Sequence, residues 1–171
     1  IGNVAVNSSY DVKLSEIHGM AQRGGSVISS IRMGEKVYSP LIEKGAADII
    51  LAFEELEALR WLDYLAPDGR VIVNRQQILP ASVLTGQAVY PEEIIDKIRE
   101  RVGNIITIDA LTVARKCGTT RVVNTVLIGI LASLLDFPIE MWRTSLKRLI
   151  PERYLGANSK AFEEGYNYGL N

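Results

Sequence analysis

Short apolar segments of strand length alternate with longer segments of helical character, and this alternation constrains the fold more than any other feature of the sequence. The segments expected as strands are 10–14, 27–33, 48–53, 70–74 and 104–109. The segments expected as helices are 54–65, 91–101, 110–117, 123–135, 139–149 and 159–170. This order predicts the α/β class, with a single doubly wound, mostly parallel sheet that carries helices on both faces in a Rossmann-like arrangement.

Proline marks several of the expected boundaries. The run Pro67-Asp68-Gly69 is typical of a turn, and we expect it to end the helix at Leu65 and lead into the next strand. Pro91 stands just before two glutamates, which suits a helix start because proline is tolerated in the first turn and acids favour the positive end of the helix dipole. Pro138, with Glu140 close behind it, suits a helix start for the same reason. Pro151 is expected to end the helix that begins at Ile139.

Length and charge limit the number of domains and the kind of partner. The 171 residues fit one domain, 1–171, and 47% of them are hydrophobic, as in an ordinary globular core. The 19 basic and 20 acidic residues leave no basic excess, so we do not expect nucleic acid to bind. The longest apolar run, 122–135, contains three polar residues and falls short of the roughly twenty residues that span a bilayer, so we expect a core helix and no membrane segment.

The single cysteine, Cys117, limits the redox chemistry of the chain. It is consistent with a reducing compartment, so we expect a cytoplasmic protein, and its helical surroundings favour a buried, inert thiol. Iron–sulfur clusters normally take four cysteine ligands, so any electron relay must lie in a partner. His18 is the only histidine, which argues against a metal site, although it could act as a general base near neutral pH.

The segment between the first two expected strands has the composition of a binding loop. Residues 15–25 hold a carboxylate, the histidine, an amide, a guanidinium and three glycines, with little apolar content. Glycine lets a ligand approach the main chain, and Arg23 offers a planar fork of donors that suits phosphate or carboxylate. Two glycines before a strand are also typical of a plain turn, and that alternative stays open.

Four more positions follow expected strands or open a helix, where ligands bind in open α/β sheets. Glu54 and Asp109 are candidate ligands, but for each the favoured interpretation is a cap of the helix that it precedes. Asn124 could be a cap or a contact. Asn74 with Arg75 forms an unusually polar exit from an apolar strand, and for this pair the functional and the structural interpretations are balanced.

Several familiar catalytic motifs are missing from the sequence. The glycines at 24 and 25 lack the GxGxxG spacing and precede a strand, which removes the helix-dipole argument for phosphate binding. No serine has the elbow spacing of α/β-hydrolases, and no Gly-Asp-Gly motif for thiamine diphosphate is present. Trp61 and Trp142 are expected to serve as packing residues or partner contacts. We therefore assign no residue to bond breaking.

Three stretches carry a resemblance to a known family. The segment 16–27 resembles the loop of the gamma domain of 2-oxoacid:ferredoxin oxidoreductases, most closely that of the small subunit of indolepyruvate enzymes. Residues 47–54 with 57–60, and 124–129, resemble the family's strand with its helix start and its late buried helix. The family opens with a strand and a Gly-rich turn that are absent here, so we expect a gamma-type domain that is N-terminally incomplete, with residues 1–9 as the end of its first helix.

The resemblance implies a non-catalytic subunit of a complex that converts an aryl 2-oxoacid and CoA to acyl-CoA, carbon dioxide and reduced ferredoxin. Thiamine diphosphate, Mg and iron–sulfur clusters would sit in a large catalytic subunit, while this chain would bind no cofactor alone. CoA could lie at the interface, and the isolated chain could form a homodimer. The residues expected at the substrate, CoA or subunit contact are Glu16, His18, Gly19, Gln22, Arg23, Gly24, Gly25, Glu54, Asn74 and Asn124.

Two hypotheses from other classes stay open. The first is an independent nucleotide-binding reductase domain of Rossmann type, which would bind a dinucleotide without a partner. The second is a scaffold module that binds only protein. Titration of the chain with CoA and NAD, with and without a large subunit, distinguishes these two hypotheses from the oxidoreductase subunit that the resemblance implies.

Overall fold

A computed structural model describes residues 1–18 and 27–171. Its elements follow in the order α1 (Gly2–Asn7), β1 (Asp11–His18), β2 (Val27–Gly34), β3 (Ala47–Ala52), α2 (Glu55–Trp61), η1 (Leu62–Tyr64), β4 (Leu65–Asn74), α3 (Ala81–Leu84), α4 (Ile94–Arg101), β5 (Ile105–Ile108), α5 (Ala110–Lys116), η2 (Thr120–Val122), α6 (Val123–Leu134), α7 (Ile139–Leu149) and α8 (Glu152–Gly169). Each strand and helix expected from the sequence is present, including the helix at the start of the chain.

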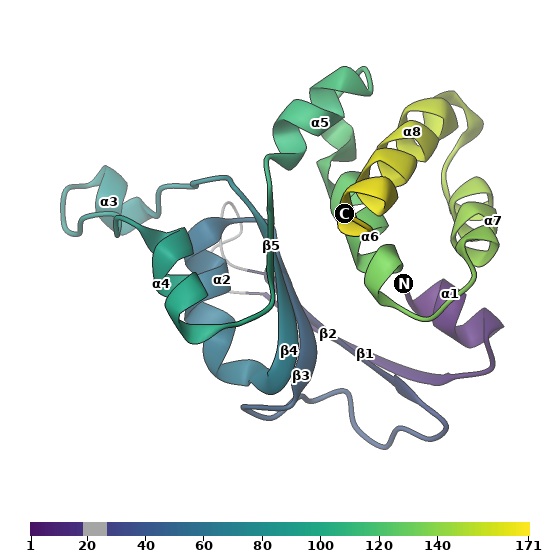
Figure 1. Cartoon of the computed structure of the whole chain (residues 1–171), viewed down its shortest axis with the longest axis horizontal. Helices are drawn as coiled ribbons and strands as arrows, with labels where there is room; N and C mark the ends of the chain where they lie inside the picture. Colours follow the sequence, from purple (N-terminus) through teal and green to yellow (C-terminus); the bar gives the residue numbers. More distant parts are fainter. Residues whose placement is uncertain (19–26) are drawn as a thin grey trace.

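Three parallel strands form the main sheet in the order β3-β4-β5. Figure 1 shows α2 and α4 on one face and α5, α6 and α8 on the other. In the central strand Val71 and Val73 pack toward α2 and α4, while Ile72 packs against α5 and α6. Because both faces are covered, β4 ends in a continuous apolar run rather than an alternating one. The predicted α/β class with helices on both faces is confirmed.

The first two strands pair with each other and not with the parallel sheet. β1 and β2 run antiparallel in register from Asp11 opposite Gly34 to His18 opposite Val27. Their connection is short, and a parallel pair needs a crossover of a dozen or more residues, so an antiparallel hairpin is the accessible arrangement. The described strands therefore form two sheets where the sequence led us to expect one.

Several boundaries differ from expectation. β1 extends to His18 instead of ending at residue 14. Helix α4 begins at Ile94 with Glu93 as its N-cap, so Pro91 lies before the helix and does not start it. The predicted turn at 67–69 lies inside β4, whose pairing with β3 shifts from Ala47 opposite Leu65 to Ile49 opposite Arg70. Residues 66–69 thus bulge out of the ladder while Leu65 keeps its partner. Helix α8 begins at Glu152, earlier than predicted, because Pro151 both ends α7 and stands as the N-cap of α8. The short helix α3 was not predicted.

The helices on the far side of the sheet pack around an aromatic core. Val4, Ala132, Trp142 and Phe162 are buried together and join α1, α6, α7 and α8. Trp142 is 2% exposed and lies between the rings of Phe137 and Phe162. The predicted packing role of this tryptophan is confirmed.

Candidate functional site

Two of the predicted site residues meet at the carboxyl end of the parallel sheet. Glu54 follows β3 and Asn74 ends β4, and both side chains are buried, with 6% and 1% of the residue exposed. Asn74 donates to the carbonyl oxygen of Phe53 at 3.1 Å, so the ends of β3 and β4 are tied together beside Glu54. This is the edge of an open α/β sheet at which ligands bind.

Glu54 caps α2 and also holds a later segment of the chain. Its Oε2 accepts from the Glu57 backbone N–H at 2.8 Å, so the predicted alternative of a helix cap is confirmed. Its Oε1 accepts from the Ile78 backbone N–H at 3.3 Å and from the Tyr90 hydroxyl. One buried carboxylate therefore receives three donors from three parts of the chain, which satisfies its charge in a buried setting.

Tyr90 and Glu55 belong to the same cluster, and neither is among the residues predicted for the site. Burial, and then the hydrogen bond to Glu54, raise the pKa of Tyr90, so its hydroxyl stays protonated and donates at neutral pH. Glu55 is 6% exposed, and its Oε2 accepts from Gln77 Nε2 at 3.1 Å. The two adjacent glutamates could have flagged the site, but Tyr90 lies 36 residues from Glu54 and only the folded chain brings them together.

Both polar atoms of the Asn74 side chain form hydrogen bonds with other parts of the protein. Its Oδ1 accepts from the backbone N–H of Ala110 at 3.0 Å, and its Nδ2 donates to Phe53 and to Gln76 Oε1 at 3.1 Å each. Ala110 is the first residue of α5, so this amide satisfies one of the free N–H groups of a helix start. Asn74 thus fixes the relative positions of β3, β4 and α5, which is a positioning role at the sheet edge.

Asp109 caps the helix that follows it, whereas Asn124 lies inside the first turn of its helix. Asp109 accepts from the Thr112 backbone N–H at 2.9 Å and from its hydroxyl at 2.6 Å, and these hydrogen bonds lower the pKa of Asp109. Its predicted capping role is confirmed. Asn124 does not cap α6, whose N-cap is Val122. It is exposed on the first turn, where its Oδ1 accepts from the Thr125 hydroxyl at 3.4 Å, so a contact role for it stays a prediction.

Only part of the predicted binding loop lies among the described residues. Glu16 is an exposed residue of β1 and accepts from the Ser29 hydroxyl across the hairpin at 3.2 Å. His18 is the last residue of β1. The predicted site residues Gly19, Gln22, Arg23, Gly24 and Gly25 lie outside the described residues. Their roles stay predictions.

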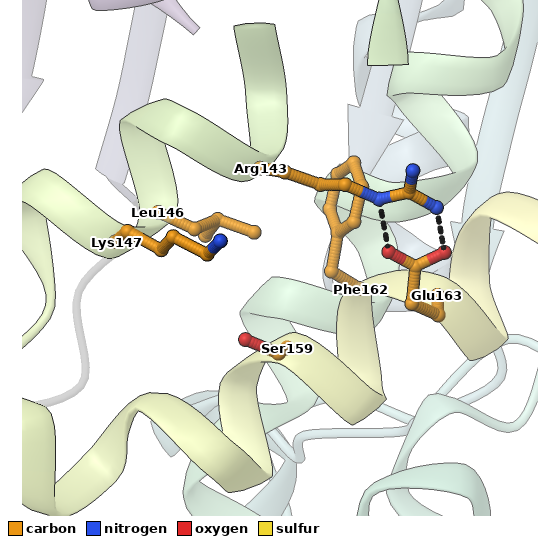
Figure 2. A pocket seen from close by; sticks show the side chains of 6 residues that line it. All are labelled: Arg143, Leu146, Lys147, Ser159, Phe162 and Glu163. Carbon is orange, nitrogen blue, oxygen red and sulfur yellow. Dashed lines mark hydrogen bonds and ion pairs between the residues drawn. The ribbon is translucent and has the colours of Figure 1, made fainter. Parts of the chain in front are cut away.

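A hollow lies between α7 and α8, away from the sheet edge. Figure 2 shows the bidentate pair between Arg143 and Glu163 on its wall, with Lys147 and Ser159 among the other lining residues. The two Arg143–Glu163 hydrogen bonds measure 2.7 and 2.8 Å, and Arg143 also pairs with Glu140. These bonds lower the pKa of Glu163 and raise that of Arg143. The charged groups of this wall are therefore engaged with each other, and the pair ties α7 to α8.

The described ranges 1–18 and 27–171 contain no candidate metal site, and their cysteine is buried. These residues contain no group of three or more His, Cys, Asp or Glu side chains placed to hold a metal ion. Burial raises the pKa of Cys117, so its thiol stays protonated at neutral pH, as expected of an inert cysteine. In the same ranges, every helix is too short or too polar to cross a bilayer.

Comparison with known sequences gives consistent matches along the chain. A family model described as pyruvate ferredoxin/flavodoxin oxidoreductase matches residues 1–168. The indolepyruvate oxidoreductase subunit IorB of Thermococcus kodakarensis is 37% identical over 172 residues, which cover 96% of this chain and 84% of the relative. IorB of Archaeoglobus fulgidus is 37% identical over 174 residues, covering 99% of this chain and 86% of the relative.

Solved structures share the fold at lower identity. The gamma subunit of the keto/oxoacid ferredoxin oxidoreductase from Geobacter sulfurreducens superposes with a TM-score of 0.69 at 19% identity, covering 98% of this chain and 86% of that one. The 2-oxoglutarate:ferredoxin oxidoreductase from Magnetococcus marinus gives a TM-score of 0.69 at 17% identity, covering 99% of this chain and 27% of that one. The same fold thus occurs both as a separate chain and as part of a longer one.

Proposed function

Because the chain belongs to the pyruvate ferredoxin/flavodoxin oxidoreductase family, we propose that it is the small subunit of a 2-oxoacid:ferredoxin oxidoreductase of the indolepyruvate type. The observation that carries this proposal is the identity of 37% to IorB subunits over 96% and 99% of the chain. The complex would oxidatively decarboxylate indolepyruvate or a related aryl 2-oxoacid with CoA. Its products would be acyl-CoA, carbon dioxide and reduced ferredoxin.

The redox cofactors of such a complex fit a partner subunit better than this chain. Iron–sulfur clusters normally need four cysteine ligands, and this sequence has one cysteine. Nor do the described residues gather the carboxylates or histidines that would hold a metal. Thiamine diphosphate, Mg and the clusters would therefore reside in a large catalytic subunit, and the isolated chain would be inactive.

The contribution of this chain would be to complete the passage for 2-oxoacid or CoA at the subunit interface. The loop 16–25 carries the donors for this role, and Arg23 is the cation suited to a carboxylate or a phosphate. Glu54 and Asn74 would support this role indirectly, because their hydrogen bonds hold the ends of β3, β4 and α5 in place. Asn124 supplies an exposed amide at the start of α6.

A reconstitution experiment tests the proposal. The chain is co-expressed with a large subunit that carries thiamine diphosphate and clusters, and ferredoxin reduction is measured with indolepyruvate, phenylpyruvate, pyruvate and 2-oxoglutarate, each with and without CoA. We expect CoA-dependent reduction that is fastest with the aryl substrates. Equal rates with all four acids would contradict the indolepyruvate assignment, and binding of NAD by the isolated chain would favour an independent nucleotide-binding domain instead.

A further inference from the structure

One segment of the surface has an unusual composition. Residues 76–91 contain no Asp, Glu, Lys or Arg, although these residues make up 23% of the chain. Every residue of this segment is exposed or half-buried, and the short helix α3 within it buries none of its side chains. Figure 1 shows α3 at the outer end of a long connection that leaves the sheet after β4 and returns at α4. This segment is called the docking arm below.

The docking arm exposes large apolar side chains. Ile78 is 56% exposed, Leu79 45%, Leu84 71% and Val89 87%. Summed over these four residues, the exposed area is on the order of 500 Å², within the range of the largest apolar patch of a typical monomer. Exposed apolar side chains on a segment without charge are typical of the core of a protein–protein interface, where charged residues are depleted.

The docking arm is held from its two ends by a single carboxylate oxygen. Glu54 Oε1 accepts from the Ile78 backbone N–H near one end and from the Tyr90 hydroxyl near the other. Between these points the chain closes tight turns, with Thr85 N–H donating to the Ala81 carbonyl oxygen at 2.9 Å and Gln87 N–H to that of Ser82 at 2.8 Å. The arm is thus ordered by a buried anchor and by its own turns, while α3 itself buries no side chain. A preordered surface loses less entropy when a partner binds.

The lack of charge in the docking arm and the size of its exposed apolar area limit which partner can bind it. A charged surface placed against this neutral segment would lose its hydration without gaining an ionic partner, so the complementary patch must be neutral and apolar. The exposed apolar area is below the roughly 800 Å² that each partner contributes to a standard stable interface, so the arm alone is too small for a lasting homodimer. The docking arm is of the right size to form one part of a larger interface. That interface would also include the sheet edge beside Glu54 and Asn74.

We propose that the docking arm, residues 76–91, binds a neutral apolar surface of the large catalytic subunit, with Glu54 and Tyr90 as its positioning residues. This inference rests on the proposed function and goes beyond it, since it assigns the contact to a segment outside the predicted binding loop. The contact sets the carboxyl end of the parallel sheet against the partner.

Substitution of the two most exposed apolar residues of the docking arm tests the proposal. The variant Leu84→Ser/Val89→Ser is compared with Leu149→Ser/Leu170→Ser, which alters apolar residues that are 63% and 62% exposed elsewhere on the chain. The dissociation constant for the large subunit is measured by titration calorimetry, with the melting temperature as a check on folding. We expect the docking-arm variant to bind at least tenfold more weakly, and the control variant to bind within about twofold of wild type.

Each result of this comparison has a distinct meaning. Wild-type affinity in the docking-arm variant would overturn the inference and leave the proposed function intact. Failure of the wild-type chain to bind the large subunit would overturn the proposed function and this inference together. A homodimer of the wild-type chain in sedimentation that is lost in the docking-arm variant would identify a second copy as the occupant and also overturn the inference.

Tyr90→Phe tests the positioning role separately, because it removes one hydroxyl and leaves the exposed apolar residues intact. We expect faster amide hydrogen exchange at residues 78–90 and weaker binding by about threefold or more. Unchanged exchange and unchanged affinity would remove Tyr90 from this role.

Discussion

Gly165 of α8 lies directly against Gly129 of α6. A β-carbon added to Gly165 would come within 3.2 Å of the Gly129 Cα and 2.0 Å of the Val126 carbonyl oxygen. The two backbones are therefore in contact at this crossing, and α8 can cover the buried helix α6 only because neither position carries a side chain. The aromatic core of Trp142 and Phe162 forms beside this contact.

Gly165→Ala is expected to destabilise the fold by about 2–3 kcal/mol, because the added methyl group must push two packed helices apart. The matched control is Gly156→Ala in the same helix, where a β-carbon would meet no atom within 4 Å. There the higher helix propensity of alanine should raise stability by about 0.5–1 kcal/mol. Urea unfolding of both variants measures the difference, and equal stabilities would contradict the close contact.

Asn74→Ala is expected to cost about 2–3 kcal/mol, because it leaves the Ala110 N–H and the Phe53 carbonyl oxygen without their buried partner. Asn124→Ala, a change at an exposed amide, should alter stability by less than about 0.5 kcal/mol. Thermal and denaturant unfolding compare the two. A stable Asn74 variant would mean that its hydrogen bonds do not hold the sheet edge.

The Arg143–Glu163 pair should give a pH-dependent contribution to stability. The pKa of Glu163 is lower in the folded chain than its usual value of 4.5, so the stabilisation is complete above that value and is lost as the pH falls through the folded pKa. Both side chains are more than a third exposed, so water screens the pair and keeps its contribution small.

Glu163→Gln tests this contribution through the melting temperature. We expect a decrease of about 1–2 °C near pH 7 that shrinks below pH 4.5 and also in high salt. A decrease that stays constant down to pH 2 would show that the loss comes from packing and not from charge.

Arg23→Ala is expected to lower the activity of the complex at least about tenfold, the scale of one lost charge-assisted hydrogen bond, without an appreciable change in melting temperature. Arg148→Ala, at an exposed position on α7, is the control. Steady-state assays of the reconstituted complex compare the two variants. Full activity in the Arg23 variant would remove this guanidinium from the site.

The sequence predicted those parts of the fold that depend on local chemistry. The apolar run 71–73 marked a strand covered on both faces, and Glu54 and Asp109 were recognisable as helix caps because a cap lies within a few residues of its donor. Pro151 was interpreted as the end of one helix when it also begins the next. The proline itself indicates that an element ends at this position. That a helix begins directly after it depends on how α8 packs against the rest of the chain.

The candidate site was less accessible from the sequence because its contacts join distant segments. The bond between Tyr90 and Glu54, and the bond from Ala110 to Asn74, each span 36 residues. No periodicity or spacing predicts such pairs, since they depend on how β3, β4 and β5 are ordered in the sheet. The absence of charge in the docking arm was readable from the sequence, but its exposure was not.

In the proposed function, this chain supplies a structural part of a redox enzyme whose cofactors lie in a partner. The most direct test is the rate of indolepyruvate- and CoA-dependent ferredoxin reduction by a large subunit, titrated with this chain. We predict a rate that is negligible for either protein alone and that saturates at one small subunit per large subunit. Ferredoxin reduction by this chain alone, or a large subunit whose full rate does not change when this chain is added, would contradict the claim.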